Sequence, residues 1–346
     1  MSRASGALFL DKSRGFGYNI GKNGTDGIEN EGNGFMPERE PEGLLILDKP
    51  AGITSHDCVG IMRRLYHTRK VGHTGTLDPM ATGVLPILLG RAAKAAEFLV
   101  SEEKHYLAGL RFGMTTDTED STGTVLTTSD AIPDAEAVQA VLPRFRGNIM
   151  QVPPMYSALK RDGQKLCDLA RAGVTVEREA RPVTISALTA EQGADGDWIL
   201  DVHCSKGTYI RTLCADIGAV LGCGAVMTSL RRLGTGGFDL SRAHTVEELE
   251  AMTDEERLSL LLPTEELFAE QRVLLLPAFY ERLADNGQPV WMHKLKPKAE
   301  PPFTEGEYVR LHGEAKGFFA LGQIMLLPDD TGEPRLAAKA VKKFVL

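Results

Sequence analysis

The order of strand-like and helical segments is the feature that most limits the fold of this chain. Residues 44–47 form a short apolar run, and residues 104–112 alternate between apolar and other side chains, which is typical of strands. Residues 55–66 and 209–221 repeat apolar side chains every three or four positions, which indicates helices. Because these segments do not follow a regular βαβ rhythm, an α+β fold is favoured over a doubly wound parallel sheet.

The two ends of the chain differ from its middle in composition and in the pattern of apolar residues. Residues 1–42 are rich in Gly, Asn, Asp and Glu without apolar periodicity, so we predict a disordered N-terminal tail. Residues 43–265 are expected to form the main domain. Residues 272–346 hold short β-like pieces between Gly, Pro and Asp turns, which predicts a small β-barrel-like second domain. Its expected strands are Val273–Leu276, Tyr308–Leu311, Phe318–Ile324 and Phe344–Leu346.

Composition excludes several classes of protein. With 42% hydrophobic and 25% charged residues, the 346-residue chain has an ordinary globular composition. No apolar run approaches the roughly 18 residues of a membrane-spanning helix, and no secretory signal is expected because Asp11 and Lys12 interrupt the first apolar stretch. The five cysteines lack Cys-x-x-Cys spacing, so we expect no metal, no disulfide framework and a reducing, cytoplasmic location.

The glycine-rich loop Gly72–Gly83 is the most informative segment for function. Its three glycines allow sharp turns or close approach to a ligand, and Pro79 favours an extended conformation at Asp78. The loop lacks the lysine of a P-loop, which argues against a nucleotide-phosphate site. From local chemistry alone, a plain surface turn is as good an interpretation as a functional loop.

This loop, Gly-His-Thr-Gly-Thr-Leu-Asp-Pro-Met-Ala-Thr-Gly-Val-Leu, resembles the catalytic motif of the TruB family of tRNA pseudouridine synthases. Several other stretches resemble family motifs in the family's order, over about residues 43–240. They are residues 47–55 (LDKPAGITS), 104–120, 151–158 (QVPPMYSA), 206–213 (KGTYIRTL) and 229–232 (SLRR). Residues 272–346 are similar, more loosely, to the family's C-terminal PUA domain.

The resemblance implies a fold, a reaction and a set of site residues. The fold is the pseudouridine synthase fold, a mixed, mainly antiparallel sheet flanked by helices. The enzyme isomerises a flipped-out uridine, at position 55 in the T-arm of tRNA, with an aspartate beside the sugar as nucleophile or base. Asp78 matches that aspartate. The remaining matches are Arg211, which pairs with it; Tyr106, which stacks on the uracil; Tyr209 and Leu230 in the pocket; and His73, which occupies the space of the flipped base. Asp120 is expected in the supporting polar network.

The reaction exchanges no electrons and adds no atoms, so no cofactor is expected. The only partner expected is tRNA, with no membrane, no obligatory protein partner and a monomeric state. Two other interpretations stay open: an RNA-binding or tRNA-folding protein with secondary isomerase activity, and a nucleoside glycosidase, which needs a second catalytic carboxylate.

The net charge of −8 argues at first against a nucleic-acid partner. Residues 245–270 hold nine acidic residues and one basic residue, so this segment alone accounts for a charge of −8. Basic residues cluster elsewhere, over residues 63–70 and 144–181, where they are expected either to contact RNA phosphates or to form solvated helix faces.

Overall fold

The computed structural model describes residues 40–98, 103–161, 163–193, 195–295, 301–329 and 331–345. The disordered tail expected over residues 1–42 therefore lies, except for its last three residues, outside the described part. Among the described helices, none is long and apolar enough to cross a membrane.

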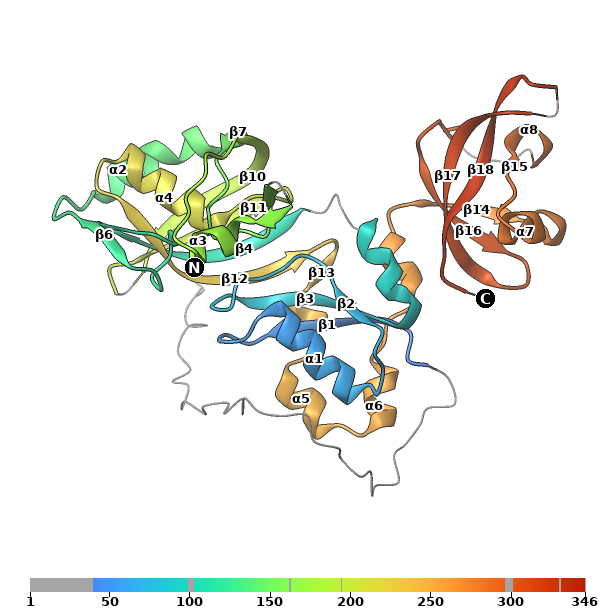
Figure 1. Cartoon of the computed structure of the whole chain (residues 1–346), viewed down its shortest axis with the longest axis horizontal. Helices are drawn as coiled ribbons and strands as arrows, with labels where there is room; N and C mark the ends of the chain where they lie inside the picture. The colour runs from blue at the N-terminus through green and yellow to red at the C-terminus, as the bar shows by residue number, and fades with distance from the viewer. Residues whose placement is uncertain are drawn as a thin grey trace, which may run out of the picture. The chain divides into compact units, whose positions relative to one another are not determined.

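A large mixed sheet forms the centre of the main domain (Figure 1). Its strand order is β1 (Gly43–Lys49), β3 (Thr82–Leu89), β12 (Ala225–Thr235), β4 (Lys104–Phe112), β11 (Trp198–Cys204), β10 (Arg181–Gln192) and β7 (Gly147–Gln151). Two short strands extend it: β2 (Val71–His73) pairs with β3, and β13 (Phe238–Asp239) pairs with β12. Within this sheet, β12 and β3 run parallel, whereas the other described neighbours are antiparallel. The expected α+β class with a mainly antiparallel sheet is confirmed.

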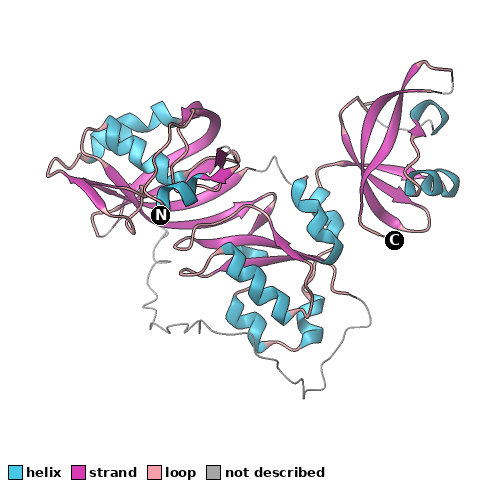
Figure 2. Cartoon of the chain, in the orientation of Figure 1, coloured by secondary structure: helices cyan, strands magenta, loops and turns pink. Residues whose placement is uncertain are grey.

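Helices pack against this sheet and bury its apolar side chains (Figure 2). The helix α4 (Ile210–Val220) contributes Leu213 and Ile217 to a core that includes Ala108 and Leu110 of β4. The helix α1 (Ser55–Leu65) packs Val59 and other apolar residues on a second core under β1 and β3. Further helices of the main domain are α2 (Ala135–Val141), α3 (Leu166–Arg171), the 3-10 segments Gly90–Glu97, Leu142–Phe145 and Leu240–Arg242, and the helices of the acidic segment.

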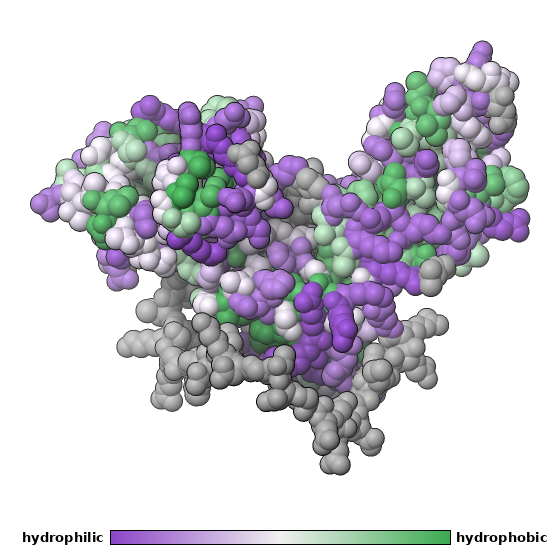
Figure 3. All heavy atoms as spheres, in the orientation of Figure 1, coloured by the Kyte–Doolittle hydropathy of each residue, from purple (hydrophilic) through white to green (hydrophobic). Residues whose placement is uncertain are grey.

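Local capping explains where several helices begin. Thr54 accepts a hydrogen bond from the N–H of Asp57, and the Asp57 carboxylate accepts one from Thr54 in return, which is a capping box at the start of α1. Capping boxes also begin two helices of the acidic segment, residues 245–270. Thr245 with Glu248 begins α5 (Val246–Ala251), and Thr253 with Glu256 begins α6 (Asp254–Ser259). Part of the segment's acidity therefore serves helix formation, and Figure 3 shows hydrophilic side chains gathered over α5 and α6.

A second, five-stranded sheet follows from residue 272 and curls into a half-barrel (Figure 1). Its order is β14 (Arg272–Leu276), β16 (Tyr308–Gly313), β17 (Gly317–Pro328), β18 (Pro334–Lys343) and β15 (Val290–Trp291), with α7 (Ala278–Asp285) and α8 (Met292–Leu295) beside it. Its apolar core includes Leu274, Val309, Leu311 and Ile324. Three of the expected strands appear here, and the expectation of a β-barrel-like C-terminal part is confirmed.

The prediction of a strand at Phe344–Leu346 was wrong. Residues 344–345 are not in a strand, because β18 ends at Lys343 and Phe344 is instead buried in an apolar cluster. The N-cap residue of α4 is Tyr209, whose side chain makes no capping hydrogen bond.

Candidate active site

The loop between β2 and β3 is held from three sides by side chains that bind its backbone. The buried Lys49 ammonium donates hydrogen bonds to the carbonyls of Pro79 at 3.2 Å and Ala81 at 2.7 Å. The Ser55 hydroxyl accepts from the N–H of Leu77 at 2.9 Å and lies 3.1 Å from its carbonyl. Arg232 donates to the carbonyl of Gly75 at 2.8 Å. The loop is therefore a fixed platform that presents Asp78 rather than a plain surface turn.

The loop ends where two strands approach closely. Gly83 has φ +102°, and a Cβ placed there would lie 2.1 Å from the carbonyl oxygen of Arg232. Only glycine allows this approach without strain. The parallel contact of β3 with β12 thus depends on Gly83, and it brings the loop beside the strand that carries Leu230.

Asp78 and Arg211 form an ion pair. The Nε atom of Arg211 lies 3.0 Å from Oδ2 of Asp78, and its Nη2 atom lies 3.5 Å from Oδ1. The Arg211 side chain is 7% exposed and that of Asp78 is 37% exposed. The guanidinium is therefore shielded behind the carboxylate, and the carboxylate keeps one open side toward the cavity.

The same guanidinium has three further partners. It donates to the carbonyls of Thr118 at 3.2 Å and Tyr156 at 2.9 Å, and it lies 3.7 Å from a carboxylate oxygen of Asp120. Asp120 is itself buried and accepts hydrogen bonds from Thr118 and Thr122. Asp120 therefore belongs to the polar network around Arg211, as expected from the sequence.

The pocket changes the acidity of Asp78. Burial raises the pKa of Asp78 above its ordinary value; the Arg211 cation opposes that rise and the Asp120 carboxylate adds to it. A nearby cation by itself lowers a carboxyl pKa. Desolvation prevails here, so the proton is held more tightly than by an aspartate in water.

Asp78 opens onto a cavity of about 260 Å³. Five of the six predicted site residues line it: Asp78, Tyr106, Tyr209, Arg211 and Leu230. They come from the loop after β2, from β4, from the N-terminal end of α4 and from β12. Residues far apart in the sequence thus meet around one space, with a carboxylate, two phenols and an apolar side chain at its wall.

The two phenols differ in burial. Tyr106 is 6% exposed on the central strand β4, and Tyr209 is half-buried at the N-cap of α4. Burial raises the pKa of both phenols above the ordinary value. Both rings therefore remain neutral at physiological pH and present apolar faces to the cavity.

His73 does not line the cavity. It belongs to β2, where it pairs with Ile87 of β3, and burial lowers its pKa below the ordinary value. Its Nδ1 atom is buried without a hydrogen-bond partner. The imidazole is therefore held neutral at the start of the same loop that carries Asp78.

Two residues that the sequence argument did not select shape the site. Arg232 is fully buried, lines the cavity and donates to the carbonyl of Val84 at 2.7 Å. It follows Leu230 by two positions, so strand periodicity places both on one face, but β12 was not predicted as a strand. Gln151 of β7 binds the backbone of Tyr209 with both ends of its amide, at 2.8 Å and 3.1 Å. It thereby fixes the backbone of the N-cap residue of α4, and no sequence pattern indicated this.

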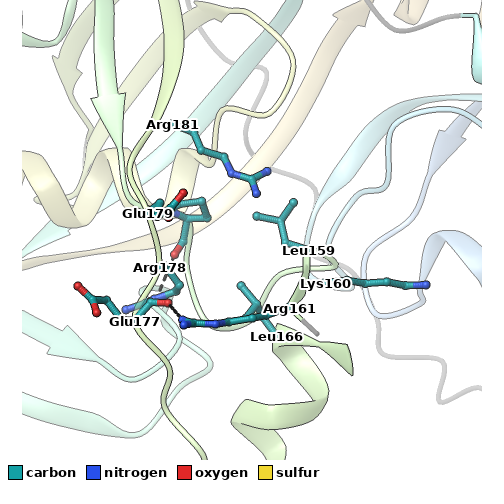
Figure 4. Close-up of a pocket in the computed structure, with 9 residues that line it drawn as sticks. Leu159, Lys160, Arg161, Leu166, Glu177, Arg178, Glu179 and Arg181 are labelled. Atoms are coloured by element: carbon teal, nitrogen blue, oxygen red, sulfur yellow. Dashed lines mark hydrogen bonds between the residues drawn. The ribbon is translucent and has the colours of Figure 1, made fainter. Parts of the chain in front are cut away.

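A second, basic cavity of about 360 Å³ lies along the next part of the chain (Figure 4). The segment 153–161 lines both cavities, with Tyr156 to Ala158 in the first and Leu159 to Arg161 in the second. Figure 4 shows Arg161 hydrogen-bonded to the carbonyl of Glu177. Four basic and two acidic residues line this second cavity: Lys160, Arg161, Arg178, Arg181, Glu177 and Glu179. Its lining therefore carries a net positive charge next to the Asp78 cavity.

Comparison with known proteins identifies the family. A model described as the N-terminal domain of TruB family pseudouridylate synthases matches residues 63–210, and one for the C-terminal domain of tRNA pseudouridylate synthase B matches residues 211–269. A tRNA pseudouridine synthase B of Burkholderia mallei is 47% identical over 277 residues, 80% of this chain and 91% of that protein. One of Azoarcus sp. is 50% identical over 244 residues, 70% of this chain and 81% of that protein.

Solved structures share the fold. A chain in the crystal structure of a Cbf5-Nop10-Gar1 complex matches with a TM-score of 0.65 at 24% identity, over 88% of this chain and 85% of that chain. A chain in the archaeal box H/ACA sRNP Nop10-Cbf5 complex matches with a TM-score of 0.63 at 23% identity, over 88% and 86%. At this identity the likeness concerns the fold alone.

The matches define the class of this protein as a pseudouridylate synthase, an isomerase. Within that class, the chain belongs to the TruB family. The resemblance seen in the sequence and the expected isomerase are both confirmed.

Proposed function

We propose that this isomerase acts on tRNA and converts the uridine at position 55, in the loop of the T-arm, to pseudouridine. Relatives that are about half identical over most of the chain are named tRNA pseudouridine synthase B, which supports tRNA as the substrate. The position follows from the resemblance of the Gly72–Gly83 loop and the later motifs to the TruB family. We also propose that the protein is a monomer, that it acts in the cytoplasm and that it needs no cofactor.

Asp78 is the proposed nucleophile, and its pairing with Arg211 is the observation that carries this assignment. The reaction breaks the bond from N1 to C1′, rotates the base and joins C5 to C1′, while the proton of C5 is lost and N1 gains one. A carboxylate beside the sugar suits this chemistry because it can add to the substrate and leave again. The open side of Asp78 faces the cavity, and Arg211 behind it favours the ionised form.

The other cavity residues are assigned to binding the flipped nucleotide. Extrusion of a base from its stack costs a few kcal/mol, and stacking on an aromatic ring returns roughly 1–3 kcal/mol. Tyr106 supplies that ring from β4, Tyr209 lines the cavity from the N-cap of α4, and Leu230 provides the apolar surface. His73, at the start of the catalytic loop, is assigned to the space that the base vacates in the RNA.

Phosphate contacts are assigned to basic residues beside the cavity. Lys160 and Lys165 are exposed on the hairpin of β8 (Lys160–Arg161) and β9 (Gln164–Lys165), and Arg181 lines the basic cavity next to it. An RNA loop with a base in the Asp78 cavity would pass its backbone over this region. Residues 43–265 are the proposed catalytic domain, and the half-barrel within residues 272–346 is the proposed PUA-like RNA-binding domain.

Release of tritium from tRNA labelled at uridine C5 tests the assignment of Asp78. The wild-type chain is expected to release one tritium per target uridine, and Asp78→Asn essentially none. Asp130→Asn, which removes a charge from an exposed aspartate outside the cavity, serves as the control and should match the wild type. Wild-type release by Asp78→Asn would remove Asp78 from the reaction.

Two further measurements separate the alternatives. If the main role is tRNA folding, Asp78→Asn will refold tRNA as fast as the wild type, and loss of isomerisation will leave the biological role intact. If the chain is a glycosidase, mass spectrometry will detect free uracil. Isomerisation leaves the mass of the nucleoside unchanged.

A further inference from the structure

Two histidines and an aspartate meet on the strands β4 and β11, away from the residues assigned to catalysis. His105 of β4 lies directly opposite His203 of β11 in the antiparallel pairing, and Asp201 lies two positions before His203 on the same face. The two imidazole rings stack with centroids 3.9 Å apart and planes 19° apart, so one ring must turn before both imidazoles point a nitrogen at the same ion. Directly opposed side chains on neighbouring strands are close enough to share a ligand.

The donor atoms of these three residues have the spacing of metal ligands. The Nε2 atom of His105 is hydrogen-bonded to Oδ1 of Asp201 at 2.8 Å, a contact that a bound ion would replace, and the Nε2 atom of His203 lies 3.9 Å from the same oxygen. One donor atom from each residue can be chosen so that all three lie within 4.8 Å of one another. Ligands at about 2.0–2.1 Å from a tetrahedral zinc ion are separated by about 3.3 Å, a value between the two observed distances.

We propose that His105, Asp201 and His203 form a binding site for a divalent transition-metal ion of the zinc type. Two imidazole nitrogens and one carboxylate oxygen suit zinc and its neighbours, whereas magnesium and calcium prefer oxygen ligands alone. The three side chains are 29%, 43% and 40% exposed, so an ion reaches them from solvent and a water molecule completes its coordination.

The site lies on the face of the sheet opposite to the Asp78 cavity. Neighbouring residues of a strand point to opposite faces, and Tyr106, next to His105, lines that cavity. His105 and His203 instead line a different cavity of about 650 Å³, together with residues 234–239. A bound ion therefore takes no part in the isomerisation. It links β4 to β11 and stabilises the strand that presents Tyr106.

This inference departs from the expectation of no metal drawn from the sequence. That expectation considered ligands close together in the chain, and His105 and His203 become neighbours only through the pairing of β4 with β11. The inference is independent of the proposed tRNA substrate, because metal binding is measured without RNA.

Titration of the metal-free, full-length chain with Zn²⁺ in a calorimeter tests the proposal. The wild type is expected to bind one equivalent and to melt at a higher temperature with Zn²⁺ present. His105→Gln and His203→Gln should each weaken binding by about 100-fold, and Asp201→Asn by about tenfold or more. The control is His244→Gln, because the His244 side chain is also 29% exposed and also lies near one carboxylate, Glu248. It should bind like the wild type.

Two readouts keep the test decisive. Melting temperatures without metal establish that each variant is folded, and Co²⁺ in place of Zn²⁺ reports the ligands through its visible spectrum. A spectrum of nitrogen and oxygen ligands that disappears in His203→Gln supports the site. The proposal is overturned by the absence of saturable binding, by unchanged binding in both histidine variants, or by a thiolate charge-transfer band from the cysteines.

Discussion

The Arg211 guanidinium lies between two carboxylates, at 3.0 Å from Asp78 and 3.7 Å from Asp120. The Arg211 and Asp120 side chains are each 7% exposed, whereas Asp78 is open to the cavity. One cation is thus shared by a structural carboxylate and by the proposed nucleophile. The position and the charge state of Asp78 both depend on Arg211, and this dependence leads to the first prediction.

Replacement of Arg211 by lysine should lower isomerase activity by about 100-fold. Lysine keeps the charge, but its single ammonium group cannot reproduce the hydrogen bonds of the planar guanidinium to Asp78 and to the carbonyls of Thr118 and Tyr156. A displacement of about 1 Å in an active site can lower the rate by about 100-fold. The pH profile is the distinguishing measurement. With a weaker cation the pKa of Asp78 rises further, so the acidic limb of the kcat/KM profile should move to higher pH. An unchanged acidic limb would contradict the ion-pair account.

Gln151→Ala should misplace the N-terminal end of α4. Gln151 is 2% exposed, and its loss leaves the N–H of Tyr209 without its partner, whereas the carbonyl of Tyr209 keeps its hydrogen bond from the N–H of Leu213. The unpaired N–H is expected to destabilise the fold by about 1–3 kcal/mol. Activity should fall as well, because a shift of this end of α4 displaces both Tyr209 and Arg211 from the cavity wall. Urea unfolding and initial rates measure the two effects. Gln139→Ala, which removes one hydrogen bond to the carbonyl of Ala190 on an exposed helix face, is the control and should retain activity.

Asp216→Asn should stabilise the protein at neutral pH. Burial, together with the nearby Glu119 carboxylate, raises the pKa of Asp216 to about 6. A carboxyl whose pKa is raised by folding contributes stability below its ordinary pKa, and this contribution is lost as the pH rises through about 6. Because Asp216 is only partly buried, the expected gain from Asn at pH 8 is about 1 kcal/mol.

Urea unfolding at pH 4 and pH 8 measures the effect of Asp216→Asn. The variant and the wild type should be nearly equal at pH 4, and the difference should grow between pH 4 and pH 7. Asp130→Asn, at an exposed position, should show no such change. Equal stability of Asp216→Asn and wild type at both pH values would contradict the raised pKa.

RNA binding should weaken with salt, and Lys160→Ala with Lys165→Ala should reduce that dependence. Each lost phosphate contact lowers the slope of log affinity against log salt concentration by about 0.7–0.9. The control is Lys94→Ala, which removes an exposed lysine outside the basic clusters. Affinities for unmodified tRNA at several salt concentrations provide the test. A slope unchanged in the double variant would mean that the hairpin does not contact phosphate.

The sequence predicted the strands with strong alternation most accurately. Lys104–Phe112 has the expected limits, because its apolar residues Tyr106, Ala108, Leu110 and Phe112 recur at every second position and all four are buried. The strand β12 was missed because Arg231 and Arg232 interrupt its apolar pattern. Arg232 is buried only through carbonyl partners supplied by β3 and by the catalytic loop, and a local pattern cannot reveal such partners.

The residues of the site likewise fall into those that the sequence predicted and those that it did not. Motif resemblance selected five residues that do line one cavity, since the motif residues occur together in the family. The residues that hold them in place were not selected: Gln151 acts on the backbone of Tyr209, and backbone partners carry no sequence signature. The raised pKa of Asp78 also has no sequence signature, because it depends on how much water the folded pocket excludes.

Position-resolved mapping of pseudouridine on unmodified tRNA tests the central claim most directly. The account predicts that wild-type protein introduces pseudouridine at position 55 of the T-arm loop, and that Asp78→Asn introduces none while it still binds the tRNA. Pseudouridine at another position, or wild-type modification by Asp78→Asn, would contradict it.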